Sequence, residues 1–158
     1  MIGDLNMSTT KSMEKLNTKM TFFINYDGEN VSYIDSENHS VCCCDIWMAS
    51  LPNNDGSIQN GHRPVLIISN NKNNKYSTVV NVIPMTTKMN KRHLPCHVSI
   101  WDYKRFGLYA PSTIMVEQIT TIPKDNLKYY MGRMDDEAIL FDIYEAIRTQ
   151  FPILDNAK

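Results

Sequence analysis

Three apolar runs, separated by polar residues, occupy residues 45–86 and constrain the fold more than any other part of the chain. They read D-I-W-M-A-S-L, R-P-V-L-I-I-S-N and S-T-V-V-N-V-I-P-M, and the segments between them are rich in Asn, Gly and Lys. Runs of this length with such boundaries predict β-strands. The long polar loop at residues 52–61 ends close to Arg63, so strand ends and a loop are expected to meet around that arginine.

The same alternation of short apolar runs and turn signals continues along the chain. Strands are predicted at residues 44–51, 63–70, 77–85, 94–101 and 113–122, with a polar turn at 70–75 and a short helical turn at 126–130. A helix is predicted at residues 135–150, with Asp135 as its cap and an apolar stripe formed by Ile139, Leu140, Ile143 and Ile147. This pattern predicts a mainly β protein, a small barrel with a C-terminal helix.

Two features of the first strands bear on the site. Ile46 and Trp47 point to opposite faces of their strand, so one face is expected to be buried and the other to line a groove or a dimer contact. Pro64 cannot donate to a strand ladder, which predicts a place at the start of the second strand and puts Arg63 at the mouth of the barrel.

Residues 1–40 differ from the rest and are polar and rich in Asn and Ser. Met13, Leu16 and Met20 have helical spacing, and the turn signal Asp27-Gly28 predicts a hairpin across residues 21–34. We interpret residues 1–40 as an N-terminal extension, partly ordered, ahead of a compact domain at residues 41–158. A structural role and a role in partner binding or regulation both stay open.

The net charge of −1 over 158 residues argues against uniform binding of phosphates, so any contact with nucleic acid needs a local basic groove. No apolar run approaches the roughly 20 residues that span a bilayer, and no secretory pattern is visible at the N-terminus. A cytoplasmic protein without membrane contact is expected.

The cysteines and histidines give no metal signature. Cys42, Cys43, Cys44 and Cys96 follow neither zinc-ligand spacing nor a spread-out disulfide framework, which leaves reduced structural thiols and a thiol site as alternatives. The histidines lack metal-ligand spacing, and no phosphate-binding glycine loop occurs. We therefore expect chemistry that needs no metal and no other cofactor.

Three side chains could act on a phosphate. Arg63 offers a planar, permanently charged fork that suits phosphate, although its position is equally compatible with a surface ion pair. The Thr86 hydroxyl could donate to a phosphate oxygen, although threonine is common in strands for its β-propensity alone. His62 could be a general base, but in an extended strand it points away from the face of Arg63.

Basic residues also lie close to aromatic ones. The set comprises Lys88, Lys91, Arg92, Tyr103, Lys104, Arg105 and Phe106. Single-stranded nucleic acid is held by such sets, because bases stack on rings and phosphates pair with cations. A solvated charged surface is the alternative.

Taken in order, several segments resemble the MazF/PemK toxin family of type II toxin–antitoxin systems. They lie between about residues 44 and 147 and include D-I-W-M-A-S-L, S-I-Q-N-G-H-R-P-V-L-I-I-S-N, T-K-M-N-K-R-H-L-P-C-H-V and V-E-Q-I-T-T-I. The resemblance implies an SH3-like barrel of the CcdB/PemK type with a C-terminal helix, assembled as a homodimer. It also implies a ribosome-independent, metal-independent endoribonuclease (an mRNA interferase), neutralised by a cognate antitoxin.

The resemblance assigns roles to particular residues. It implies that Arg63 and Thr86 are catalytic and that single-stranded RNA is cut to a 2′,3′-cyclic phosphate and a 5′-hydroxyl. The implied RNA-binding residues are Ser57, Gln59, His62, Thr87, Lys88, Lys91, Arg92 and Gln118. The chain departs from many relatives at Thr120, where a basic residue is common, and at Pro84.

Two other functions remain open at this point. A CcdB-like toxin has the same kind of barrel and poisons DNA gyrase without cutting RNA. A catalytically degenerate relative would only bind an antitoxin or RNA. Arg63 and Thr86 favour the nuclease, because a protein-binding poison has no use for that pair.

Overall fold

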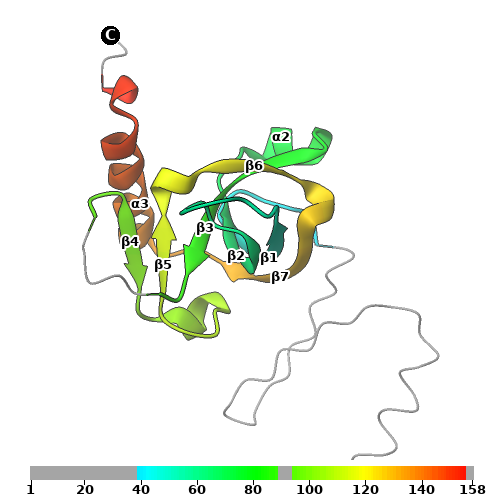
Figure 1. Cartoon of the computed structure of the whole chain (residues 1–158), viewed down its shortest axis with the longest axis horizontal. Coiled ribbons are helices and arrows are strands. Elements are labelled where there is room, and N and C mark those ends of the chain that lie inside the picture. Colours follow the sequence, from blue (N-terminus) through cyan, green and yellow to red (C-terminus); the bar gives the residue numbers. More distant parts are fainter. Residues whose placement is uncertain (1–38, 89–93, 156–158) are drawn as a thin grey trace, which may run out of the picture. The chain divides into compact units, whose positions relative to one another are not determined.

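The computed structural model describes residues 39–88 and 94–155 (Figure 1). The strands are β1 (Asp45–Leu51), β2 (Gly61–Ile67), β3 (Val79–Thr86), β4 (His97–Ile100), β5 (Ser112–Met115), β6 (Thr120–Pro123) and β7 (Leu127–Arg133). The helices are α2 (Asn71–Tyr76) and α3 (Glu137–Gln150), with 3₁₀ turns η1 (Tyr103–Phe106), η2 (Val116–Gln118), η3 (Lys124–Asn126) and η4 (Pro152–Leu154). The predicted mainly β fold with a C-terminal helix is confirmed.

All pairings in the sheet are antiparallel, in the order β4-β5-β3-β2-β1-β7, with β6 paired to β3. The strands around β1, β2, β3, β6 and β7 curl as in a barrel (Figure 1). Within residues 39–88 and 94–155, β7 pairs with β1 alone, so the sheet formed by these residues is not closed.

Strand β3 is the centre of this arrangement. Val82 pairs with Ile67 of β2 and with Thr120 of β6, so β2 and β6 lie on opposite edges of β3. The last two residues of β3 pair with β5. The single strand predicted at residues 113–122 is therefore wrong: it is interrupted by η2, which inserts residues that have no partner on β3.

The curled sheet has buried residues on both faces. Ile46 of β1 belongs to one apolar cluster with Leu66 and Ile83, whereas Trp47 belongs to a second cluster with Val65. The Trp47 face of β1 is therefore buried as well, and its last residue, Leu51, also lines the groove described below, as expected for that face. The dimer contact stays a prediction. Helix α3 packs its residues Ile143 and Ala146 onto the first cluster, and Ile139, Leu140 and Ile147 lie beside them, as the apolar stripe predicted.

Several predicted boundaries are wrong. Strand β2 starts at Gly61, and Pro64 lies inside it opposite Met48. Only β1 pairs with the Gly61–Pro64 half of β2, since β3 joins at Val65, and a proline is tolerated on such an edge. The predicted turn at residues 70–75 is α2, capped by the Asn70 side chain, which accepts from the N–H of Asn73 at 2.8 Å.

The C-terminal third contains two more corrections. Residues 127–133 form strand β7 rather than a helical turn. Helix α3 starts at Glu137, and its cap is Asp136 rather than Asp135, because the Asp136 carboxylate accepts from the N–H groups of Ala138 and Ile139. The strands predicted at residues 44–51, 77–85 and 94–101 correspond to β1, β3 and the shorter β4.

Two glycines let η1 pack against β7. A Cβ on Gly107 would lie 1.9 Å from the Met131 carbonyl oxygen, and one on Gly132 would lie 2.4 Å from that of Phe106. The backbones touch here, so neither position has room for a side chain.

The helix predicted near residues 11–20 and the hairpin at 21–34 lie outside the described residues, so the extension at residues 1–40 stays a prediction. Within residues 39–88 and 94–155, no helix is long and apolar enough to cross a membrane.

Candidate active site

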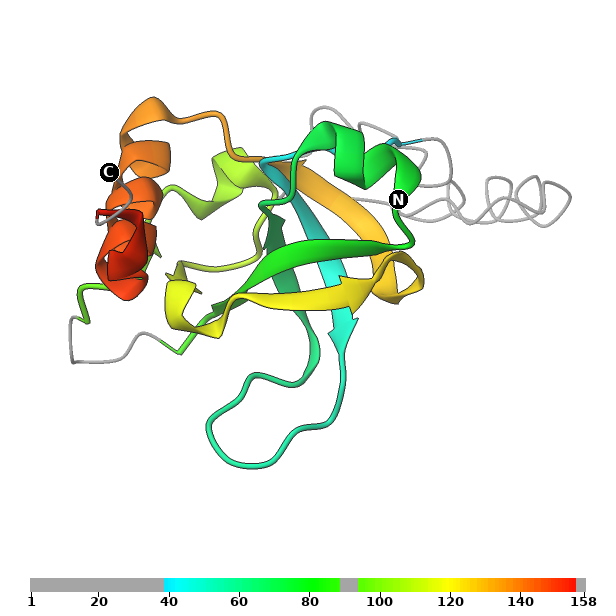
Figure 2. The same cartoon turned by 90° about the horizontal axis from the view of Figure 1, so that it is seen from above.

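The segment between β1 and β2 forms a loop that extends away from the sheet (Figure 2). It begins at Pro52 and returns to the sheet at Gly61, whose φ of +71° lies in the left-handed region that favours glycine. The two residues before Gly61, Gln59 and Asn60, are the ones that contact Arg63. The loop is thus fastened to the arginine at its returning end.

Arg63 lies in β2 and is half-buried. Its Nε donates to the carbonyl oxygen of Asn60 at 2.8 Å, and its Nη1 donates to the side-chain oxygen of Gln59. Burial lowers the pKa of the guanidinium, which remains a cation at neutral pH. No carboxylate lies within ion-pair distance of it among the described residues, so the surface ion-pair alternative has no support there.

Thr86 is the last residue of β3, at the end of the strand that faces Arg63. The β2–β3 ladder pairs Val65 with Pro84, and continuing that register by two residues places Arg63 opposite Thr86. Opposed residues of an antiparallel pair have their side chains on the same face of the sheet. The Thr86 hydroxyl accepts from the N–H of Lys88 at 3.2 Å, so its own hydrogen is free to point elsewhere.

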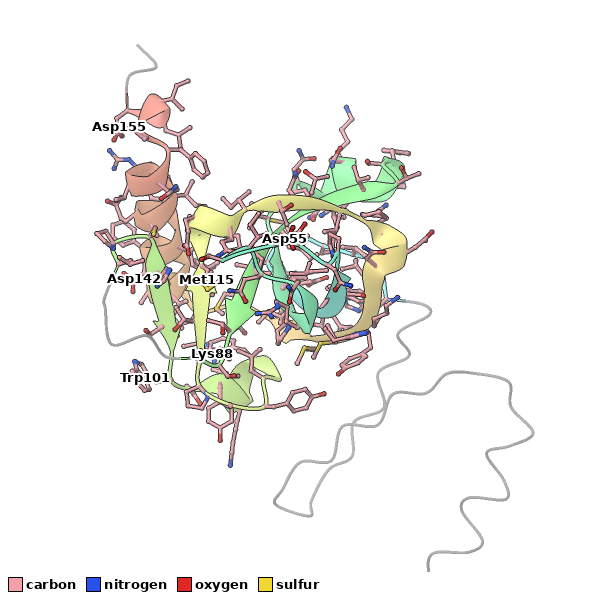
Figure 3. The ribbon with its side chains drawn as sticks, in the orientation of Figure 1. Asp55, Lys88, Trp101, Met115, Asp142 and Asp155 are labelled. Atoms are coloured by element: carbon pink, nitrogen blue, oxygen red, sulfur yellow. The ribbon has the colours of Figure 1, made fainter. Side chains whose placement is uncertain are left out.

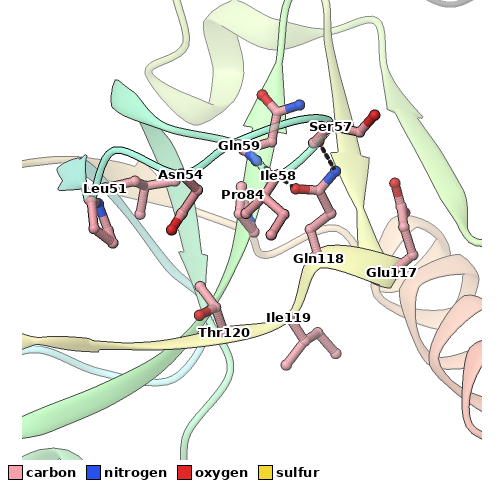
Figure 4. Close-up of a pocket in the computed structure, with 11 residues that line it drawn as sticks. Leu51, Asn54, Ser57, Ile58, Gln59, Pro84, Glu117, Gln118, Ile119 and Thr120 are labelled. Atoms are coloured by element: carbon pink, nitrogen blue, oxygen red, sulfur yellow. Dashed lines mark hydrogen bonds between the residues drawn. The ribbon is translucent and has the colours of Figure 1, made fainter.

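Gln118 fastens the loop from the far side. Its Oε1 accepts from the backbone N–H of Gln59 at 2.7 Å, and its Nε2 donates to the carbonyl of Ser57 at 3.0 Å (Figure 4). The interruption of the strand at η2 is what turns Gln118 toward the loop. The strand-like alternation of residues 113–122 did not predict that Gln118 contacts the β1–β2 loop.

A groove of about 440 Å³ lies beneath the loop (Figure 4). Its wall is formed by apolar and polar side chains, among them Leu51, Ile58, Gln59, Pro84, Gln118 and Thr120. Both residues at which the chain departs from many relatives, Pro84 and Thr120, therefore line this groove.

The other residues expected to bind RNA are spread around the site. Ser57, Thr87 and Lys88 are exposed. His62 is exposed too, but it follows the alternation of β2 and lies on the opposite face from Arg63. Lys91 and Arg92 lie outside the described residues.

The part of the basic and aromatic set at residues 103–106 contacts other parts of the fold. Arg105 pairs with Asp135 at 3.1 Å and with Asp136 at 2.9 Å, and Phe106 is buried in the first apolar cluster. These contacts join η1 to the start of α3. Arg105 and Phe106 are therefore engaged within the fold, and these contacts give no support to nucleic-acid binding by the two residues.

Known proteins share both the sequence pattern and the fold of this chain. A family model of PemK-like, MazF-like toxins of type II toxin–antitoxin systems matches residues 43–151. Endoribonuclease EndoA of Bacillus subtilis is 38% identical over 111 residues, which cover 70% of this chain and 94% of that protein.

Solved structures agree with this match. The Mycobacterium tuberculosis toxin MazF-mt6 aligns with a TM-score of 0.57 at 28% identity, covering 68% of this chain and 96% of that one. A MazF from Deinococcus radiodurans, 12% identical, shares the fold with a TM-score of 0.60, over 73% of this chain and 99% of that one.

A curled antiparallel sheet with a C-terminal helix, and an arginine hydrogen-bonded to the β1–β2 loop, are the features of a toxin fold of the MazF type. The chain belongs to the PemK-like, MazF-like toxin family of type II toxin–antitoxin systems.

Proposed function

We propose that this protein is an endoribonuclease toxin that cuts single-stranded RNA at a short sequence, with Arg63 and Thr86 as its catalytic residues. The observation that carries the proposal is the position of Arg63, opposite Thr86 by register and hydrogen-bonded to the β1–β2 loop, in a chain 38% identical to a protein named as an endoribonuclease.

The reaction uses the RNA's own 2′-hydroxyl. Its oxygen attacks the adjacent phosphorus and forms the 2′-O–P bond, while its proton passes to solvent. The P–O5′ bond breaks, and the leaving 5′-oxygen takes up a proton. The products are a 2′,3′-cyclic phosphate and a 5′-hydroxyl, and DNA is spared because it lacks the 2′-hydroxyl.

Arg63 stabilises the negative charge that grows on the phosphorane oxygens. Thr86 donates a hydrogen bond to a non-bridging oxygen and holds the phosphate in line. Asn60 and Gln59 accept from two of the five N–H groups of Arg63, so three further donors of the guanidinium serve the phosphate oxygens. Ser57, Gln59, Thr87, Lys88, Lys91, Arg92 and Gln118 contact the RNA, and His62 contacts it only from the far side of β2.

The toxin acts in the cytoplasm as a homodimer that a cognate antitoxin neutralises. The family description, which names type II toxin–antitoxin systems, supports the antitoxin. Light scattering on the purified protein, alone and with a candidate antitoxin, measures both assemblies. A strictly monomeric toxin would contradict the homodimer.

The test of the activity is incubation with a long RNA in EDTA, followed by mapping of the cut ends. Cuts at one short sequence with 5′-hydroxyl ends, absent with Arg63→Ala and absent on DNA of the same sequence, are expected. Intact RNA with folded wild-type protein would overturn the proposal and favour a gyrase-binding or degenerate toxin. Cleavage that needs added Mg²⁺ would overturn the mechanism.

A further inference from the structure

A cysteine, a histidine and a glutamate meet at the junction of β4, β5 and η2. His97 starts β4 and pairs in register with Met115, two residues before Glu117. Cys96 precedes His97, and its carbonyl accepts from the N–H of Val116 at 3.1 Å. The β4–β5 ladder therefore joins two segments that are about 20 residues apart, which is why sequence spacing gave no sign of this cluster.

The three side chains converge on one point. A thiol sulfur, an imidazole nitrogen and a carboxylate oxygen all lie within 4.8 Å of one another. His97 Nε2 lies 2.9 Å from Glu117 Oε1, and the His97 side chain is only 8% exposed. The other carboxylate oxygen, Glu117 Oε2, is buried and has no hydrogen-bond partner among the described residues.

A buried carboxylate oxygen with so few hydrogen bonds needs an explanation, because a buried polar atom without a partner is costly. The Cys96 thiol interacts with the Glu117 carboxylate, and a cation that replaces the thiol proton would be a shared partner for all three side chains. Cysteine, histidine and carboxylate are the ligands that Zn²⁺ takes in proteins, and three protein ligands with one open position is a common arrangement. Zn–ligand bonds of about 2.0–2.3 Å put tetrahedral ligands roughly 3.3–3.8 Å apart, so the three atoms would move only slightly.

We infer that Cys96, His97 and Glu117 form a binding site for Zn²⁺ or a similar soft divalent ion, with water in the fourth position. The site is separate from the proposed cleavage chemistry, which needs no metal. It lies on the wall of the groove, because Glu117 is also a groove-lining residue and directly precedes Gln118. A metal at Glu117 would hold η2 and, through Gln118, the fastened end of the β1–β2 loop.

The test needs a control for the other thiols. Cys42, Cys43 and Cys44 form a second thiol group, in which the sulfurs of Cys43 and Cys44 are 3.8 Å apart. The full-length protein is stripped with a chelator and titrated with Co²⁺, then with Zn²⁺ in competition. Cobalt reports tetrahedral geometry and a thiolate ligand through separate absorption bands.

One Co²⁺ per chain is expected, with a thiolate charge-transfer band that survives C42S/C43S/C44S and disappears in Cys96→Ser. Glu117→Gln should weaken Co²⁺ binding at least about 10-fold, because losing even a supporting group of a metal site has that effect. Absence of binding at micromolar metal, or a band that follows the triple substitution instead of Cys96, would overturn the inference. No RNA is present, so failure of the nuclease proposal leaves this result unaffected.

Discussion

The side-chain oxygen of Gln118 accepts a hydrogen bond from the backbone N–H of Gln59 at 2.7 Å. The Gln59 side chain in turn accepts from Arg63. Turn η2, the loop and β2 are therefore linked by consecutive hydrogen bonds, and the position of the proposed catalytic arginine depends on a residue on the other side of the groove.

Removal of the Gln118 side chain should loosen the loop without disturbing the core. Gln118→Ala loses two hydrogen bonds, each worth about 1 kcal/mol when the loop is ordered. We expect a KM for RNA raised up to ~10-fold and a smaller change in kcat, because the groove is formed less often. The measurement is steady-state cleavage of a short fluorogenic RNA.

Thr121→Ala is the matched control. It removes a surface hydrogen bond of similar length, from Asn81 Nδ2 at 2.8 Å, in the strand that follows Gln118 but away from the loop. If Thr121→Ala and Gln118→Ala raise KM equally, the loop linkage has no special role.

Arg63→Lys tests the shape of the cation rather than its charge. Arg63 donates from two nitrogens, and a lysine ammonium cannot reproduce that fork. We expect kcat to fall by about 100-fold or more, which is typical for loss of a positioned donor. Arg105→Lys, in the ion pairs with α3, should leave kcat near the wild-type value. Near-normal cleavage by Arg63→Lys would show that simple charge is enough.

The close contact at Gly107 predicts a large loss of stability on substitution. Gly56 and Gly107 have almost the same φ, +73° and +71°, but a Cβ at Gly56 meets nothing within 4 Å. Gly56→Ala should therefore cost about 1–2 kcal/mol, the strain of the left-handed conformation. Gly107→Ala adds overlap with the Met131 carbonyl, which should cost about 1–3 kcal/mol more. Urea unfolding of both variants measures the difference, and equal losses would contradict the packing argument.

The cap of α3 predicts a loss of stability in acid. The N–H of Ile139, followed by that of Ala138 and the charge of Arg105, lowers the pKa of Asp136. A carboxyl whose pKa is lower in the folded state contributes stability above its unfolded pKa, and that contribution is lost as the pH falls through the folded value. Melting temperatures should therefore decline below about pH 4.

Asp136→Asn separates the charge from the cap. Asparagine still accepts from the helix N–H groups, so this variant should lose less stability than wild type between about pH 5 and pH 3. Asp142→Asn, an exposed substitution in the same helix (Figure 3), is the control. Identical acid profiles for wild type and Asp136→Asn would contradict the role of the Asp136 charge.

The strands that sequence reasoning found are those whose apolar residues run on without a break. Val65 to Ile67 and Val80 to Met85 are buried, and their composition alone indicates strands. Strand β7 was missed because L-K-Y-Y-M-G-R does not alternate apolar and polar residues, and its register with β1 shifts twice. Its glycine, Gly132, is required by the close approach of Phe106, a contact that only the folded chain reveals. Helix α2 was missed because six residues are too few to show an apolar stripe.

The candidate site divides in the same way. Arg63 and Thr86 were singled out from local motifs, and the β2–β3 register relates them. Two other features depend on η2: the hydrogen bonds from Gln118 to the loop, and the contact of Cys96 with Glu117. Turn η2 interrupts the predicted strand, yet the sequence at residues 113–122 still alternates as a strand would. Periodicity cannot report such an interruption, because three inserted residues look like more strand.

The hydrogen bonds of Gln118 also have a consequence for the order of events during synthesis. One bond joins Gln118 to Gln59, a separation of 59 positions, and the other joins it to Ser57, a separation of 61 positions. Contacts between such distant segments form late, because the loop of chain between them must first be closed. A nascent chain exposes Arg63 and Thr86 to the cell before Gln118 has left the ribosome. We expect ribosome-bound chains that end before residue 112 to be cut by protease at residues 52–60. The complete chain should resist cleavage there. On this order of events, the proposed active site is completed only near the end of translation.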